Sequence, residues 1–189
     1  MPARSTSSAS TSPITAGKSS PLQESVIKHK LTRYSPIEQG GTCMDVGVAV
    51  AKHRELVQPY ADRGIKIGSP AVTNGGEDNK GLSYLKNFLD QCTGCTIDFV
   101  SIHWQSEAAT DVSTFTDHVK KAHELTGKPV WVTEYQAPAG VDQVKFLKDA
   151  SAWMDQQDFV QRYAYFSVDA KMTNGDSLNE LGAAYAGIN

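Results

Sequence analysis

Short apolar runs recur along the chain from about residue 65, and stretches with helical spacing of apolar residues follow them. The runs are rich in β-branched and aromatic residues, a composition typical of buried strands. They fall at 65–73, 96–104, 129–135 and 161–169. A spacing of roughly 30 residues is the length of one strand with one helix, and repeats of that unit predict a parallel sheet.

Helical spacing predicts five helices around these runs. They cover residues 45–60, 81–91, 111–125, 141–156 and 178–185. In the second, Leu82, Leu85 and Phe88 fall on one face, as in a helix that packs on a core. Asp111 is a suitable N-cap for the third helix, and Gly127 can end it.

Two architectures use such repeats, an open doubly wound sheet and a (β/α)8 barrel. The loop Asn74-Gly75-Gly76 lacks the glycine-rich motifs of nucleotide-binding sheets. A barrel predicts polar and aromatic residues where its strands end. Those positions hold Ser69, Asn74, His103, Trp104, Glu134, Tyr135, Ser167 and Asp169. Because a full barrel needs about 250 residues, we expect an α/β fold that is a partial (β/α)8 TIM barrel.

The amino-acid composition excludes some classes of partner and indicates where the folded domain begins. Residues 1–35 are rich in Ser and Thr, so we expect them to be disordered and residues 36–189 to form the domain. With a net charge of −3 and no basic block, nucleic acid is not an expected partner. No apolar run approaches the roughly 18 residues of a membrane helix, and residues 1–20 lack the apolar core of a secretory signal.

Glu134 is the strongest candidate for chemistry. It follows the apolar strand residues 130–133, and ligands of parallel α/β folds bind at the carboxyl ends of the strands. The alternative is an ion-paired Glu at a strand end. Trp104, beside His103, could form an aromatic platform on which a ligand ring stacks. Trp131 lies in mid-strand and is expected in the core.

Two further residues have both a binding and a structural interpretation. Asn74 could bind a ligand hydroxyl or make the turn before Gly75, and Tyr135 could contact a ligand or pack. No metal or other cofactor is expected.

The three cysteines are Cys43, Cys92 and Cys95, and the last two form a CxxC. A zinc site would need two further ligands at similar spacing, and no second pair exists. The pair follows a predicted helix rather than opening one, which disfavours a thioredoxin-like motif. We expect a short structural disulfide, with two inert thiols as the alternative. Cys43 is expected to pack as a small apolar residue.

Several motifs resemble those of a known family. They are Lys66-Ile-Gly-Ser-Pro-Ala-Val-Thr-Asn-Gly-Gly76, Cys92-Thr-Gly-Cys-Thr-Ile-Asp-Phe99, His103-Trp104, Lys128-Pro-Val-Trp-Val-Thr-Glu134 and Asn174-Gly-Asp176. From about Cys43 to the C-terminus, the chain resembles the fungal glycosyl hydrolase catalytic core of glycoside hydrolase family 128, the alkali-sensitive-linkage-protein type. The resemblance implies a clan A barrel that cleaves β-1,3-glucan with retention, and its strands here would be the fifth to the eighth.

The resemblance also implies roles for individual residues. Glu134 matches the nucleophile, whereas the Asn-Glu-Pro motif that carries the family's acid/base is absent. Glu38 is a weak candidate for that role, and Glu107 is expected to be a solvated loop charge. With a glucan as the ligand, His103, Trp104, Asn74 and Asp169 are expected to contact sugar.

The expected function is therefore an endo-β-1,3-glucanase, impaired by the missing acid/base. The alternative is a non-catalytic β-glucan-binding remnant or a fragment of a longer enzyme. Exposed sheet edges favour self-association. The family resemblance implies an extracellular or cell-wall location, and a mis-assigned N-terminus would explain both the missing strands and the missing signal.

Overall fold

The structure is a computed structural model that describes residues 44–105, 111–167 and 171–187. The chain divides into two compact units, Met1–Cys43 and Met44–Asn189. All described residues belong to the second unit, so the predicted domain boundary after residue 35 lies outside them. No helix among the described residues is both long enough and apolar enough to cross a membrane.

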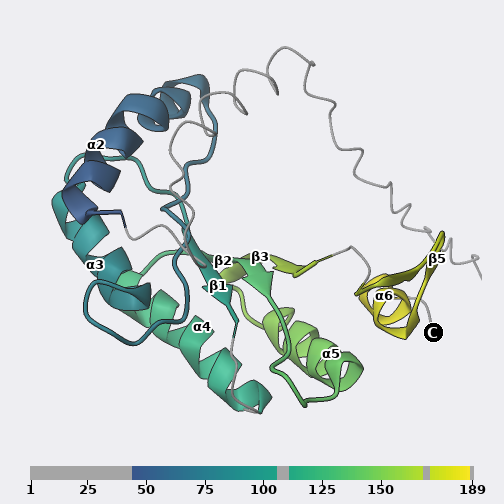
Figure 1. The fold of residues 1–189 in the computed structure, drawn as a ribbon. Coiled ribbons are helices and arrows are strands. Elements are labelled where there is room, and N and C mark those ends of the chain that lie inside the picture. The colour runs from purple at the N-terminus through teal and green to yellow at the C-terminus, as the bar shows by residue number, and fades with distance from the viewer. Residues whose placement is uncertain (1–43, 106–110, 168–170, 188–189) are drawn as a thin grey trace, which may run out of the picture. The chain divides into compact units, whose positions relative to one another are not determined.

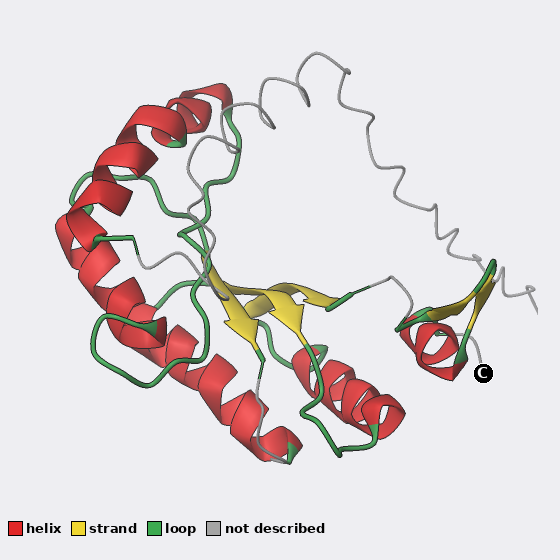
Figure 2. Cartoon of the chain, in the orientation of Figure 1, coloured by secondary structure: helices red, strands yellow, loops and turns green. Residues whose placement is uncertain are grey.

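From residue 81 to residue 165 helices and strands alternate along the chain (Figures 1 and 2). In order they are α2 (Val46–Leu56), η1 (Gln58–Arg63), α3 (Gly81–Gln91), β1 (Val100–Trp104), α4 (Val112–Thr126), β2 (Val130–Tyr135), α5 (Gln143–Met154), β3 (Val160–Tyr165), β4 (Thr173–Asn174), β5 (Ser177–Leu178) and α6 (Glu180–Tyr185). All five predicted helices are present. The short antiparallel pair of β4 and β5 was not predicted.

Strands β1, β2 and β3 form a parallel sheet in sequence order, which confirms three of the four predicted strands. The segment 65–73 lies beside β1 but makes only isolated parallel bridges, Gly68 with Phe99 and Val72 with Ile102. Pro70 has no backbone N–H to donate there, which works against a continuous ladder. A Cβ on Gly68 would come within 2.5 Å of the Phe99 ring, so this close approach requires glycine.

The core lies between the sheet and the helices that follow its strands. Figure 2 shows α4 and α5 along one side of the sheet, and the strand side chains that point to that side are almost fully buried. They include Val100, Ile102, Val130 and Val132, which pack with Phe115, Val119, Phe146 and Leu147. Burying a side chain of this size stabilises the fold by roughly 1.5–3 kcal/mol.

Trp131 is not in this core, contrary to the prediction. Strand residues alternate between the two faces, so Trp131 lies on the face opposite to Val130 and Val132, and it is only partly buried. Its ring stacks on Phe99 with centroids 3.7 Å apart, and the Arg162 guanidinium lies 5.9 Å from the ring.

The predicted N-cap of the third helix is confirmed. An Asp111 carboxylate oxygen accepts a hydrogen bond from the Ser113 N–H, and α4 ends at Gly127 with φ +63°, a conformation that favours glycine. Asp45 and Asp142 cap α2 and α5 in the same way. These caps fix where each of the three helices begins.

Candidate functional site

An irregularity in the pairing of β1 with β2 places Glu134 beside His103. Ile102 pairs with Val132, but the next residue, His103, pairs with Glu134, so Thr133 is an extra residue on β2. Such a bulge re-aims the side chains that follow it and is common next to active sites. Without it, strict alternation would put Glu134 on the helix side of the sheet.

Within the described part of the chain, two side chains make polar contacts with the Glu134 carboxylate, and both contact the same oxygen. His103 Nδ1 lies 3.5 Å from Glu134 Oε2, and Gln105 Nε2 donates to Oε2 at 3.2 Å. The Glu134 and His103 side chains are 33% and 26% exposed, so water reaches both and screens their attraction.

Asn74 joins this group through the backbone. Its Oδ1 accepts a hydrogen bond from the Gln105 N–H at 3.1 Å, which ties the loop after residue 73 to the end of β1. The structure therefore brings together three predicted site residues, Asn74, His103 and Glu134. Gln105 was not predicted, because a Gln after a strand carries no signal until the fold shows what its amide meets.

Trp104 and Tyr135 do not belong to the open site. They pair with each other across β1 and β2 and point into the core, where their exposed fractions are 5% and 0%. Phe115 packs against both, with centroids 5.8 Å from Trp104 and 5.4 Å from Tyr135. Burial raises the pKa of the Tyr135 hydroxyl far above its usual value.

The burial of Trp104 argues against its role as an open platform for a sugar, and the burial of Tyr135 favours packing, one of the two interpretations open for that residue. The residue beside a catalytic position on a strand faces the other way, and here that side is the helix layer.

Three other predicted residues, Glu38, Glu107 and Asp169, lie outside the described part of the chain, as does Cys43. The acid/base candidates therefore stay predictions. Cys92 and Cys95 form a disulfide, with the sulfurs 2.04 Å apart, in the loop between α3 and β1.

A hollow of about 540 Å³ lies at the opposite end of the sheet. Lys66, Asp98, Trp131 and Arg162 line it, together with residues at the amino ends of β2 and β3. It is separate from the Glu134 group, because parallel strands carry the two at opposite ends.

Comparison with known proteins gives one family and several relatives. The family described as "Glycosyl hydrolase catalytic core" matches residues 7–185, a range that begins before the Cys43 start expected from the motifs. Alkali-sensitive linkage protein 1 of Schizosaccharomyces pombe is 26% identical in an alignment of 170 residues, and the match covers 79% of this chain and 30% of the relative.

Two solved structures extend the comparison. A curdlan-specific exo-β-1,3-glucanase of glycoside hydrolase family 128 from Blastomyces gilchristii is 39% identical, with a TM-score of 0.69; the match covers 75% of this chain and 62% of that one. An endo-β-1,3-glucanase of the same family from Sorangium cellulosum is 30% identical, with a TM-score of 0.61, over 75% and 63% of the two chains. This chain thus spans less than two thirds of the first structure and about a third of the yeast protein.

Proposed function

Because the chain belongs to the glycosyl hydrolase catalytic core family, we propose that it acts on β-1,3-glucan and that Glu134 is the residue that attacks the sugar. The observation that carries this proposal is the bulge at Thr133, which turns Glu134 toward His103 and Gln105 where two parallel strands end. The 39% identity to a curdlan-specific glucanase supports the choice of substrate. We also propose that the parallel sheet is part of a (β/α)8 barrel.

The geometry suggests how Glu134 would work as the nucleophile of a retaining glycosidase. Both described contacts are made to Oε2, so we assign the attack on the anomeric carbon to Oε1. The Gln105 amide donates to Oε2 and so fixes the orientation of the carboxylate, which attacks as the nucleophile. Asn74 holds the Gln105 backbone in place and is a positioning residue.

Retention requires a second carboxyl about 5–5.5 Å from the first, to protonate the leaving oxygen. The family's Asn-Glu-Pro motif does not occur in this sequence, so we propose slow turnover, with Glu38 as the weak candidate for the acid/base.

The second candidate function is glucan binding without hydrolysis. Loss of the acid/base removes most of the turnover but leaves the sugar contacts of His103 and Asn74. The absence of the Asn-Glu-Pro motif favours this second function. It predicts that the chain binds β-1,3-glucan whether or not it hydrolyses it.

Reducing-sugar release from a soluble β-1,3-glucan tests the proposal, with the wild-type chain beside Glu134→Gln. The expected result is slow release by the wild type and a loss of at least about a thousandfold in the variant. The matched control is Glu124→Gln, since Glu124 is an exposed carboxylate on α4. Pull-down on curdlan, read in parallel, supports the second candidate if binding persists without release. A folded chain that neither binds nor cleaves would refute both.

We propose a location outside the cell or in the cell wall, because a disulfide such as that between Cys92 and Cys95 persists in oxidising compartments. Cell fractionation of the producing organism would test this, and a chain found only in reducing compartments would contradict it.

We also propose self-association through the sheet. Within the described residues β3 is an edge strand, and the stacked Phe99 and Trp131 rings lie on the sheet face away from the core. Sedimentation over a range of concentrations tests this proposal, and a monomer at all concentrations would contradict it.

A further inference from the structure

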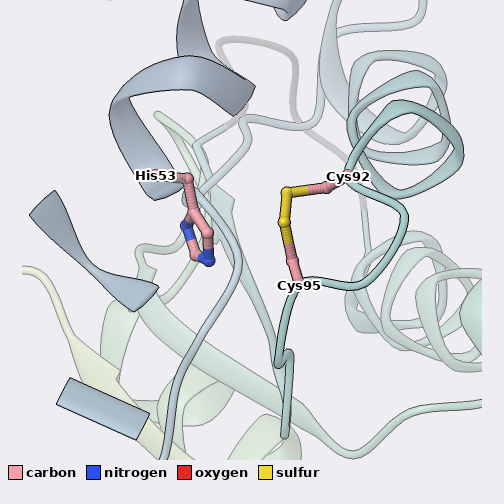
Figure 3. A group of neighbouring side chains, drawn as sticks. All are labelled: His53, Cys92 and Cys95. Carbon is pink, nitrogen blue, oxygen red and sulfur yellow. A yellow bond between two sulfur atoms is a disulfide. The ribbon is translucent and has the colours of Figure 1, made fainter. Parts of the chain in front are cut away.

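A buried histidine lies against the disulfide, on the far side of the fold from Glu134. His53 comes from α2, and Cys92 and Cys95 follow α3 (Figure 3). One ring nitrogen and the two sulfurs all lie within 4.8 Å of one another. The packing of α2 on α3 brings His53 to the disulfide, although His53 comes about 40 residues before Cys92 in the sequence.

His53 is held in place by apolar contacts, and one of its ring atoms is left without a partner. The ring meets the edge of Phe88 at 5.4 Å and 76°, and the residue is 5% exposed. Its Nε2 is buried with no hydrogen bond to the described residues, which is costly for a polar atom. Burial lowers the pKa of His53, whereas a hydrogen bond with the Thr96 backbone raises it by a smaller amount. The net lowering favours the neutral ring, which is the form that ligates metals.

We propose that His53, Cys92 and Cys95 form a site for Zn²⁺ or a similar borderline cation when the disulfide is reduced. A dithiol reductant supplies two electrons and two protons, so that the S–S bond breaks and two thiols form, while the reductant becomes a cyclic disulfide. Zn²⁺ then binds both sulfurs as thiolates and releases their two protons. The neutral Nε2 lone pair supplies the third ligand.

The distances fit this change with small movements. Tetrahedral zinc has Zn–S bonds of about 2.3 Å and Zn–N bonds of about 2.0 Å, so its ligand atoms lie roughly 3.5–3.8 Å apart. Reduction lets the two sulfurs separate to that spacing, and the ring nitrogen has at most about 1 Å to close. Cys95 is only partly buried, so a water molecule can take the fourth position from that side.

The surrounding polar groups hold the CxxC turn from outside. Arg54 Nη2 donates to the Gln91 and Thr93 carbonyls at 3.4 and 3.0 Å, which fixes the turn to α2. Its positive charge also offsets part of the charge of two thiolates. Gln58 Oε1 accepts from the Thr96 N–H at 2.8 Å and fixes the chain just after Cys95.

The disulfide and the metal site are therefore two alternative states of the same side chains. The CxxC provides two ligands. The third is His53 on α2, which comes about 40 residues earlier in the sequence, roughly one βα unit before the CxxC. Metal binding would be confined to the reduced chain.

Zinc titration of the purified full chain, reduced with a phosphine and compared with the oxidised chain, tests the proposal. The expected result is one Zn²⁺ per reduced chain and none per oxidised chain, read by competition with a chromophoric chelator. His53→Gln should weaken binding at least about tenfold, and Cys95→Ser should abolish it. Cys43→Ser, which removes the third cysteine, is the matched control and should bind like the wild type.

The proposal is overturned if reduced His53→Gln binds zinc as tightly as the wild type, or if the reduced wild type binds no better than Cys95→Ser. Should His53→Gln fail to fold, the reduced wild type decides the matter. Nitrogen NMR with Cd²⁺ should then shift Nε2 of one histidine, and an unshifted set of histidine signals overturns the proposal.

Discussion

His118 makes the stability of this fold depend on pH. The ring packs against Trp104 at 5.3 Å, directly behind the site, and its Nε2 is buried with no partner among the described residues. Burial, with a smaller contribution from the nearby Lys121 charge, lowers the pKa of His118 from 6.5 to about 4. The unfolded chain therefore takes up a proton at a higher pH than the folded one.

A histidine whose pKa is lowered on folding contributes stability that is fully present above pH 6.5. That contribution is lost as the pH falls from 6.5 toward 4, because protons then favour the unfolded chain. From those two pKa values, the free energy of unfolding should fall by about 2 kcal/mol between about pH 8 and about pH 5. The ceiling for this one group is about 3 kcal/mol.

Urea unfolding followed by circular dichroism at several pH values would measure the effect. His118→Leu should remove about 2 kcal/mol of the acid-induced loss, whatever its own cost in stability at pH 8. His53 contributes in the same direction and is present in both proteins, so it cancels in the difference. Lys121→Gln should reduce the loss only slightly, because the charge is the smaller cause.

The reasoning is refuted if the wild type and His118→Leu lose stability in parallel as the pH falls. It is also refuted if the NMR signals of His118 titrate near pH 6.5 in the folded chain.

Three more substitutions test the packing and the helix starts by urea unfolding. Leu85→Ala should lower the free energy of unfolding by about 2–5 kcal/mol, since Leu85 is fully buried. Leu125→Ala, at a side chain that is 38% exposed, should lower it far less. Equal losses in the two variants would contradict the assigned core. Asp111→Ala should cost about 1 kcal/mol by removing the cap of α4, and an unchanged stability would show that the cap contributes nothing. Gly81→Ala should cost more than about 2 kcal/mol, because the added Cβ would lie 2.1 Å from the Gly75 carbonyl oxygen and φ is +51°; a tolerated alanine would mean that the loop before α3 can move away.

Most of the fold follows from local sequence patterns. Helical spacing alone located all five predicted helices, and Asp111 and Gly127 marked the ends of α4, because caps and breakers act within a few residues. The segment 65–73 has the composition of a strand but not its hydrogen bonds. Strand pairing depends on the neighbouring segment of the chain. Pro70 and the ring of Phe99 restrict the hydrogen bonding of this segment with β1.

The candidate site was only partly determined by the sequence. The position of Glu134 at a strand end identified it, and the family motifs supported it. The orientation of the side chains around it came from the bulge at Thr133, which no local pattern announces. For that reason Trp104, expected to stack on a sugar, and Tyr135, for which contact and packing were both open, lie in the core. Gln105 lies beside Glu134 instead.

The meeting of His53 with Cys92 and Cys95 was decided by tertiary structure alone. Spacing in the sequence showed a CxxC with no second pair, which excludes a zinc site built from two such motifs. A ligand from another helix becomes visible only when α2 packs on α3. The sequence determines which residues form each helix or strand, because caps, turns and the spacing of apolar residues act locally. Which side chains from different elements meet depends on packing across the whole core.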